Sequence, residues 1–191
     1  MNHRHNKEIV IAKGMELFWN EGFHSLGVDK ICRETGMTKG AFYNAFKSKE
    51  QFLLTTLKSY GDLIESHLQT QLANDTFSAF DKLVNLYKDM LESQLQNGFK
   101  GCFVNNMMSE MSTLNENVSK LSDEQFKRFI KVIEPTVKQA QNDGDFDDNL
   151  SAKQLSEIIH TTFFGFLTRS KSLKLSTHEP MVLFLNTLKI K

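Results

Sequence analysis

Apolar residues recur along most of the chain at the three- and four-residue spacing of an amphipathic helix. In residues 7–21, for example, Val10, Leu17 and Phe18 share one stripe, and Gly22 follows as a residue suited to end the helix. Further apolar stripes or helix-capping signals occur in residues 28–35, 38–47, 48–68, 74–96, 101–112, 122–137, 151–167 and 177–188. With only 2 prolines and 10 glycines in 191 residues, the chain is predicted to be all-α, with about nine helices.

The stretch of residues 26–49 contains two of these helices, joined by a tight turn. Val28, Ile31 and Cys32 lie at positions i, i+3 and i+4, so the first helix has an apolar stripe. Gly36 is expected to end this helix, because glycine adopts positive φ without steric cost. Two short helices at this spacing predict a compact two-helix unit.

The second helix of this unit has two different faces. Thr38 can cap its first turn, and Phe42 and Phe46 form an apolar face that is expected to pack back on Ile31. The outward face consists of small, polar, basic and aromatic residues: Thr38, Lys39, Gly40, Ala41, Tyr43 and Asn44. A face of this composition on a rigid two-helix unit fits the major groove of DNA.

At these residues the chain resembles a known family. The segment TKGAFYNAFKSKEQF, residues 38–52, resembles the recognition-helix region of the TetR family of dimeric bacterial transcription regulators. The preceding GFHSLGVDKICRETGM, residues 22–37, resembles the helices and turn before it. The likeness is close over roughly residues 7–60 and elsewhere extends to the all-helical plan. One departure is Leu26-Gly27, where many members have Thr-Ser, so the hydroxyls of that position are missing here.

The resemblance implies DNA-binding roles for seven residues. The positions that match base-contacting residues are Lys39, Gly40, Ala41 and Asn44, and those that match phosphate-contacting residues are Thr38, Tyr43 and Lys49. Phosphate contacts set the register on the duplex, and short residues let the helix backbone approach the base edges. One such unit buries little surface, so two-fold pairing on double-stranded DNA is expected. A two-helix packing motif without DNA is the alternative.

The resemblance also divides the chain into two domains and implies a homodimer. Residues 1–47 match the helix-turn-helix DNA-binding domain, and residues 48–191 match a helical ligand-binding and dimerisation domain. In the family, the last two helices form a four-helix interface with a second copy. The apolar residues of this pair considered for the interface are Leu155, Ile159, Phe163, Leu167, Val182 and Leu185. Packing of these helices only within their own domain is the alternative.

Charge is unevenly distributed along a chain whose net charge is zero. Residues 1–60 contain nine Lys and Arg against six Asp and Glu, a net charge of about +3. A mildly basic N-terminal third suits phosphate contacts at one end of the protein, with Arg4 as a further candidate. The overall neutrality argues against a general nucleic-acid coat protein.

The apolar residues include 16 phenylalanines and 8 methionines, which suit both solid cores and loose apolar cavities. The candidates for lining a pocket for a small apolar or electrophilic ligand are Phe99, Phe103, Met107, Met111, Phe126, Phe129, Phe163 and Phe166. That a pocket exists is implied by the family resemblance. For each of these residues, a plain core position is an equal alternative.

Cys102 is a candidate sensor of thiol-modifying compounds. It follows Lys100 and lies near a predicted helix N-terminus, and both features favour a reactive thiolate. The stretch GCFVNNMMSEM resembles the Gly-Cys segment of the TetR branch that contains electrophile- and oxidant-responsive repressors of reductase genes. A small buried thiol is the alternative for Cys102, and Cys32 is predicted to be a core residue. Two distant cysteines predict neither a disulfide framework nor a metal site.

The sequence offers no signature of catalysis. It contains no Ser-His-Asp order, metal-ligand spacing, phosphate loop or paired carboxylates in an apolar setting, so neither an enzyme nor a bound cofactor is expected. Without a signal peptide or an apolar run long enough to cross a bilayer, a cytoplasmic location is expected. The predicted function is a DNA-binding regulator, a repressor released by a ligand or by thiol modification. A transcriptional activator or a protein-interaction module of the same fold are the alternatives.

Overall fold

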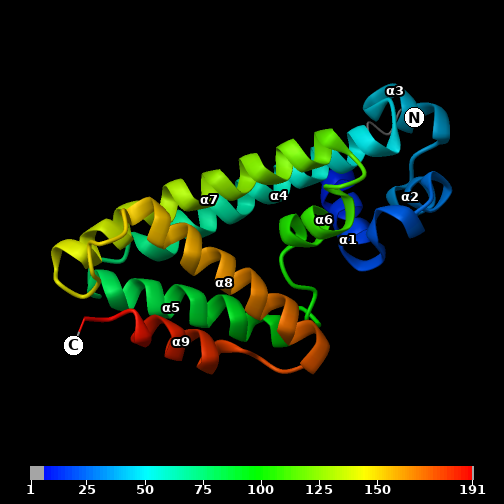
Figure 1. Ribbon diagram of the computed structural model, residues 1–191. Helices are drawn as coiled ribbons and strands as arrows, with labels where there is room; N and C mark the ends of the chain where they lie inside the picture. Colours follow the sequence, from blue (N-terminus) through cyan, green and yellow to red (C-terminus); the bar gives the residue numbers. More distant parts are fainter. Residues whose placement is uncertain (1–6, 191) are drawn as a thin grey trace. The chain divides into compact units, whose positions relative to one another are not determined.

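A computed structural model describes residues 7–190, so the candidate Arg4 lies outside the described part of the chain. These residues form nine α-helices and one short 3-10 helix, which confirms the all-α prediction (Figure 1). The elements are α1 (Lys7–Ser25), α2 (Val28–Thr35), α3 (Lys39–Phe46), α4 (Lys49–Leu72), α5 (Ala79–Glu92), the 3-10 helix Ser93–Leu95, α6 (Phe103–Met111), α7 (Glu116–Asn142), α8 (Ala152–Leu173) and α9 (His178–Thr187).

The contacts divide the chain into two compact units. Of the described residues, the first unit contains 7–63 and 103–125, and the second contains 64–102 and 126–190. Helices α4 and α7 each continue from one unit into the other. Helix α6 belongs to the first unit because it packs on α1. The predicted boundary after residue 47 divides the chain by function and stays a prediction.

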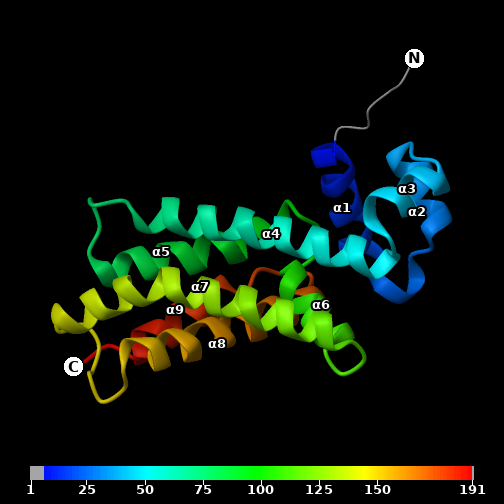
Figure 2. The same ribbon diagram turned by 90° about the horizontal axis from the view of Figure 1, so that it is seen from above.

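Aromatic rings form the core of the first unit. Phe52 of α4 packs against Phe18 of α1 and against Phe42 and Phe46 of α3, with ring centroids 5.8, 5.3 and 4.5 Å apart. Gly14 permits this packing, because a Cβ at that position would lie 2.1 Å from the Phe52 ring. Figure 2 shows α1, α2 and α3 gathered around the first turns of α4. The two short helices are therefore held on a common aromatic core.

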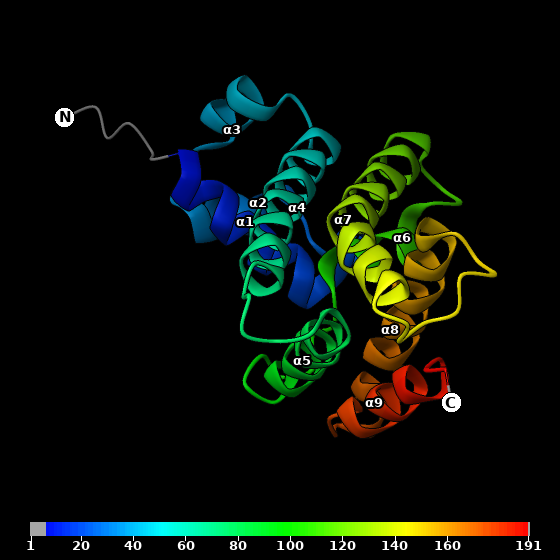
Figure 3. The same ribbon diagram turned by 90° about the vertical axis from the view of Figure 1, so that its left-hand side faces the viewer.

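The second unit is built around α5, α8 and α9. Helix α9 runs beside both α5 and α8 (Figures 1 and 3). Tyr87 of α5 and Phe163 of α8 are buried against one another, with ring centroids 5.2 Å apart. The loop after α7 is tied to the end of α9 by a β-bridge between Phe146 and Lys189. These contacts give the second unit a core of its own.

Local capping hydrogen bonds explain most of the helix starts. Thr38 Oγ1 accepts from the Ala41 N–H, and Ser151 and Gln154 form the reciprocal capping box that opens α8. The helix predicted to start near residue 74 begins instead at Ala79, because the Ser78 hydroxyl accepts from the Asp81 N–H. The sequence around residue 74 forms a local turn in which an asparagine side chain accepts from the Thr76 N–H.

The helix predicted over residues 122–137 was placed too late. It begins at Glu116, because the Asn115 side chain accepts from the Val118 N–H and caps an earlier turn. The sequence Ser-Asp-Glu-Gln from Ser122 resembles a capping box, yet it lies inside α7 and Ser122 is buried. A capping signal in the sequence therefore does not mark a helix start when a stronger one precedes it.

Candidate nucleic-acid interface

The turn between α2 and α3 has the backbone geometry that the sequence predicted. Gly36 adopts φ 71°, and the N–H of Met37 donates to the Cys32 carbonyl oxygen at 2.9 Å. Cys32 itself is buried on the apolar face of α2. Phe42 and Phe46 are buried beneath α3, so the opposite face of α3 points away from the core. The two short helices thus form a defined helix-turn-helix.

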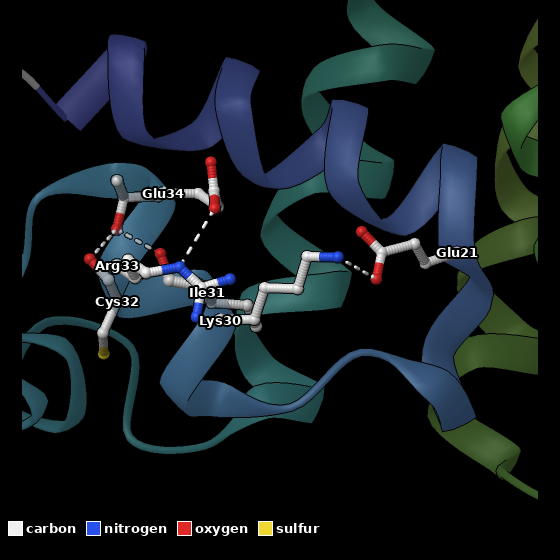
Figure 4. Close-up of polar contacts among 7 residues, drawn as sticks. Glu21, Lys30, Ile31, Cys32, Arg33 and Glu34 are labelled. Carbon is white, nitrogen blue, oxygen red and sulfur yellow. Dashed lines mark hydrogen bonds and ion pairs between the residues drawn. The ribbon is translucent and has the colours of Figure 1, made fainter.

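Polar contacts attach α2 to α1 (Figure 4). Lys30 of α2 forms an ion pair with Glu21 of α1, with the two charged atoms 2.7 Å apart. Within α2, the hydroxyl of Thr35 donates to the Ile31 carbonyl oxygen at 2.7 Å. Helix α3, which we call the reading helix, is therefore supported by α2, and α2 is itself fixed to α1.

The residues predicted to contact DNA lie together on α3. Thr38, Lys39, Gly40, Tyr43 and Asn44 are exposed, and Ala41 is partly exposed. Tyr43 keeps 47% of its surface accessible while its ring packs edge-on against the Phe42 ring. A Cβ at Gly40 would meet nothing within 4 Å, so packing inside the protein does not explain the missing side chain. This face is available to a partner.

Lys39 has a neighbour that the sequence reading missed. Its ammonium lies 2.6 Å from a carboxylate oxygen of Asp29, in the first turn of α2. The hydrogen bond from this ammonium to Asp29 raises the pKa of Lys39. Asp29 and Lys39 lie ten residues apart on different helices, so helical spacing alone could not pair them. A carboxylate therefore holds the basic residue of the reading face.

Lys49 is placed differently from the other predicted DNA contacts. Its ammonium donates to the carbonyl oxygens of Phe23 and Leu26, at 2.8 and 3.0 Å, and lies 4.1 Å from the centre of the Phe23 ring. Burial lowers the pKa of Lys49, and the charge of Glu110 opposes this effect. Two of its three N–H donors are thus used inside the protein. These internal contacts explain why a lysine occupies the first turn of α4, where the helix dipole disfavours a positive charge.

The same turn is held from the other side by Glu110 of α6. One oxygen of this carboxylate accepts from the backbone N–H of Phe23 at 2.9 Å and from that of His24 at 3.2 Å. Gly22 adopts φ 74° here, which interrupts the helical geometry of α1 as predicted. Sequence reasoning missed Glu110, because it lies 87 residues from its partner and no local pattern marks it.

The predicted ligand residues are divided between the two units, and in the second unit Phe126, Phe129 and Phe163 contact one ring, that of His160. Phe103 and Met107 are buried in the first unit, where Phe103 contacts the rings of Trp19 and Tyr60. Phe99, Phe126 and Phe163 belong to the second unit. Two surface grooves of the second unit, of about 720 and 540 Å³, are lined by α7, with α4 contributing to the smaller one, and include none of these residues. Their role in ligand binding stays a prediction.

Cys102 is buried, with 7% of its surface accessible, and directly precedes α6. The sequence pointed to Lys100 as its cationic neighbour, and the structure adds Lys171 from the last turn of α8. Burial lowers the pKa of Lys171, and the nearby Cys102 sulfur opposes that effect. An ammonium beside a thiol stabilises the thiolate, which is the reactive form.

The residues suggested for a dimer interface are core residues of the single chain. Exposure is at most 5% for Leu155, Ile159, Phe163, Leu167 and Leu185, and Val182 is partly buried. These side chains are used inside the second unit, so they cannot form most of a contact with a second copy. The outward faces instead carry Ile158, Gly165 and Leu173 on α8 and Leu183 on α9. The dimer interface stays a prediction, because a helical pattern of apolar residues does not say whether a face is covered within the chain or by a second copy.

None of the helices in residues 7–190 is long and apolar enough to cross a membrane. That part of the chain also has no group of three or more His, Cys, Asp or Glu side chains placed to hold a metal ion.

An exposed polar helix, held on a two-helix unit with a tight glycine turn, defines a helix-turn-helix DNA-binding protein. Residues 10–56 match the family model for bacterial regulatory proteins of the tetR family. Residues 79–182, more than half of the chain, match the model for the tetracyclin repressor-like C-terminal domain. The chain belongs to the TetR family and is a DNA-binding transcriptional regulator. Regulators of this family bind DNA operators, dimerise and respond to small molecules.

The relatives include named repressors. The chain is 23% identical over 179 residues to the transcriptional repressor DhaR of Mycobacterium sp. (strain GP1), covering 94% of this chain and 88% of that protein. It is 20% identical over 166 residues to the repressor NemR of Escherichia coli K12, covering 86% and 83%. The fold is similar to that of regulatory protein TetR from Rhodobacter sphaeroides, with a TM-score of 0.86, 21% identity and coverage of 96% and 98%. The reduced form of E. coli NemR gives a TM-score of 0.83 at 20% identity, covering 97% of each chain.

Proposed function

We propose that the chain is a homodimeric repressor that binds its operator through α3 and releases it on binding a ligand or on modification of Cys102. The observation that supports the DNA contact is the exposed face of α3, where Tyr43 and Gly40 have no role in the core. A small, polar and basic helix face can approach base edges in the major groove. In this pose base edges are met by Lys39, Gly40, Ala41 and Asn44, and phosphates by Thr38 and Tyr43.

The proposed dimer contact uses the outward faces of α8 and α9. Ile158, Leu173 and Leu183 expose 43, 41 and 67% of their surface, although each is apolar. Gly165 lies between the first two on α8, and a Cβ added there would meet nothing within 4 Å. Apolar residues beside a small residue suit close packing of two helices. Pairing two copies would supply the second reading helix that a specific site requires.

The proposed release by thiol chemistry rests on Cys102 and Lys171. The ammonium would favour the thiolate of Cys102, and modification would change the packing at the start of α6. The existence of a structure of NemR in its reduced form fits such a route. Release of DNA by N-ethylmaleimide should be strong in the parent and absent in Cys102→Ser. A Cys32→Ser control should respond like the parent, and equal release from all three proteins would remove the thiol route.

The experiment for DNA binding is a footprint on the DNA upstream of the chain's own gene, followed by titration at several salt concentrations. We expect a protected two-fold site and an affinity that falls steeply with salt. Tyr43→Phe removes one hydroxyl from the exposed face, so it should weaken binding several-fold on every sequence without changing the melting temperature. An absence of salt-dependent binding would refute the proposal.

The sense of regulation and the absence of catalysis are further parts of this proposal. DhaR and NemR are both named repressors, which supports repression by the present chain. A reporter placed behind the footprinted site should therefore be more active without the regulator, whereas lower activity would make it an activator. The family is regulatory, so we expect no turnover and a cytoplasmic protein.

A further inference from the structure

His160 lies in the centre of the second unit, on α8, with 1% of its surface accessible. Five aromatic rings surround its imidazole, with centroids between 4.8 and 6.0 Å away. These rings belong to Tyr87, Phe126, Phe129, Phe163 and Phe164. A polar ring thus lies in an almost entirely apolar setting.

Only one nitrogen of this imidazole is satisfied by the described residues. Nδ1 lies 3.3 Å from the hydroxyl oxygen of Tyr87, while Nε2 is fully buried and has no hydrogen-bond partner in residues 7–190. If the Tyr87 hydroxyl donates to Nδ1, a single buried group, the Nε2–H, lacks a partner. In the other tautomer both the Tyr87 proton and the Nε2 lone pair would lack one. The first arrangement leaves fewer buried polar groups unsatisfied.

A buried donor without a partner costs free energy in a protein core, because it loses its hydrogen bonds to water. An apolar residue of similar shape would fill the same space without this cost. A buried water is a poor partner, because it normally makes two to four hydrogen bonds and four of the five rings around the imidazole are phenylalanines, which offer it none. The remaining partner is a hydrogen-bond acceptor on a molecule whose other surfaces are apolar.

The imidazole is neutral, because burial lowers the pKa of His160 to about 3. A carboxylate placed beside it would have to be desolvated without a cation to receive it. An uncharged acceptor, such as a carbonyl oxygen, has no such penalty. Flat aromatic molecules also match the five rings, which favour edge and offset-stacked contacts.

We propose that the Nε2–H of His160 recognises the regulator's ligand by donating a hydrogen bond to the carbonyl oxygen of an uncharged, planar aromatic molecule. Phe126, the one partly exposed ring of the five, forms the wall that moves to admit it. This inference rests on the proposed function, since it assigns a ligand class to the regulator. It differs from the predicted pocket, in which Phe126, Phe129 and Phe163 were named and His160 was not.

The test uses the full-length protein and two molecules of the same skeleton. 1-Indanone has a carbonyl oxygen and indane does not, and neither modifies thiols. Binding is measured by calorimetry, and the His160 ring is followed by its ¹⁵N resonances in histidine-labelled protein. We expect 1-indanone to bind at least about tenfold more tightly than indane and to shift the Nε2 resonance.

Two variants and a control separate recognition from folding. His160→Phe keeps an aromatic ring and removes the donor, so the preference for 1-indanone should disappear. Tyr87→Phe removes the partner that sets the tautomer, so it should reduce the preference and remains informative if His160→Phe does not fold. The control His67→Phe, at an exposed histidine, should leave the preference for 1-indanone unchanged.

Each outcome decides the inference. Equal binding of 1-indanone and indane to the parent, or an unchanged preference in His160→Phe, would overturn it and leave His160 as a core residue. Tighter binding of benzoate than of 1-indanone would overturn the choice of an uncharged ligand. Because these measurements contain no DNA, their failure is distinct from failure of the footprint, which tests the regulator itself.

Discussion

The ammonium of Lys49 lies 2.8 Å from the carbonyl oxygen of Phe23 and 4.1 Å from the centre of its ring. A hydrogen bond and a cation–π contact thus join the first turn of α4 to the end of α1. The turn they hold leads directly into the helix-turn-helix. Lys49 therefore supports the turn that leads into the helix-turn-helix, and the phosphate contact that the family resemblance implied stays a prediction.

This relationship predicts how Lys49→Met will behave. The substitution keeps the apolar stem and removes the donors, so we expect a loss of about 1 kcal/mol in the free energy of unfolding, allowing for partial exposure. Operator affinity should fall, but the slope of log affinity against log salt should stay the same, because no phosphate contact is lost. A slope shallower by about one would show that Lys49 contacts phosphate. Lys58→Met, on an exposed part of α4, is the matched control.

Glu110 should be energetically coupled to Lys49, because both hold the same turn and their charges interact. Glu110→Gln weakens the hydrogen bonds that its carboxylate accepts from the N–H groups of Phe23 and His24. A double-mutant cycle measured by chemical unfolding should give a coupling energy of at least about 0.5 kcal/mol. Additive losses would mean that the two side chains support the turn independently.

Lys39 and Asp29 should together determine sequence preference. Lys39→Ala is expected to lower the affinity for the operator about tenfold and to change the affinity for unrelated DNA little, since a base contact contributes about 1–3 kcal/mol. Asp29→Asn removes the partner that restrains the Lys39 ammonium, and it also removes a negative charge beside the proposed DNA contact. Its affinity for unrelated DNA should rise while discrimination falls. Parallel titrations on operator and scrambled duplexes measure both, and equal losses on every sequence would make Lys39 a phosphate contact.

The helices themselves were predictable because each short signal is local. Gly36 and Thr38 act within a few residues of their own position, and the structure places both as the sequence indicated. Lys49, Glu110 and Asp29 were not predictable in their observed roles, because their partners are distant in sequence or belong to another helix. Helical periodicity reports that a residue is apolar, and it does not say which neighbour covers it.

The same limit explains the dimer face and His160. Leu155 and Ile159 are apolar and lie on α8 as expected, but α5, α7 and α9 supply enough neighbours to bury one face of that helix within the chain. Its other face carries Ile158 among polar residues, a pattern that resembles ordinary solvent exposure. His160 is a single polar residue in an apolar stripe, and only the packed core reveals its unsatisfied nitrogen.

Acid should destabilise the protein through His160. In the folded state burial lowers its pKa to about 3, whereas the unfolded chain titrates near 6.5. The unfolded state therefore binds the extra proton first, so the contribution of His160 to stability is fully present well above pH 6.5 and is lost as the pH drops below 6.5. Between pH 7.5 and 5 the parent should lose about 2 kcal/mol more than His160→Phe, measured by urea unfolding. Parallel pH curves for the two proteins would show that His160 is not held neutral.

Gly165 offers the sharpest test of the dimer. Glycine inside a helix costs about 0.5–1 kcal/mol relative to alanine, and a Cβ at Gly165 would meet nothing within 4 Å in the single chain. Gly165→Ala should therefore stabilise the protomer and leave a dimer of twice 22.0 kDa.

Gly165→Gln places a longer side chain on the outward face of α8, so it should fold normally but give a mass of 22.0 kDa by light scattering. A stable dimer of Gly165→Gln at micromolar concentration would place the interface elsewhere. If the monomer forms, operator affinity must also fall steeply, because one reading helix alone cannot engage both half-sites.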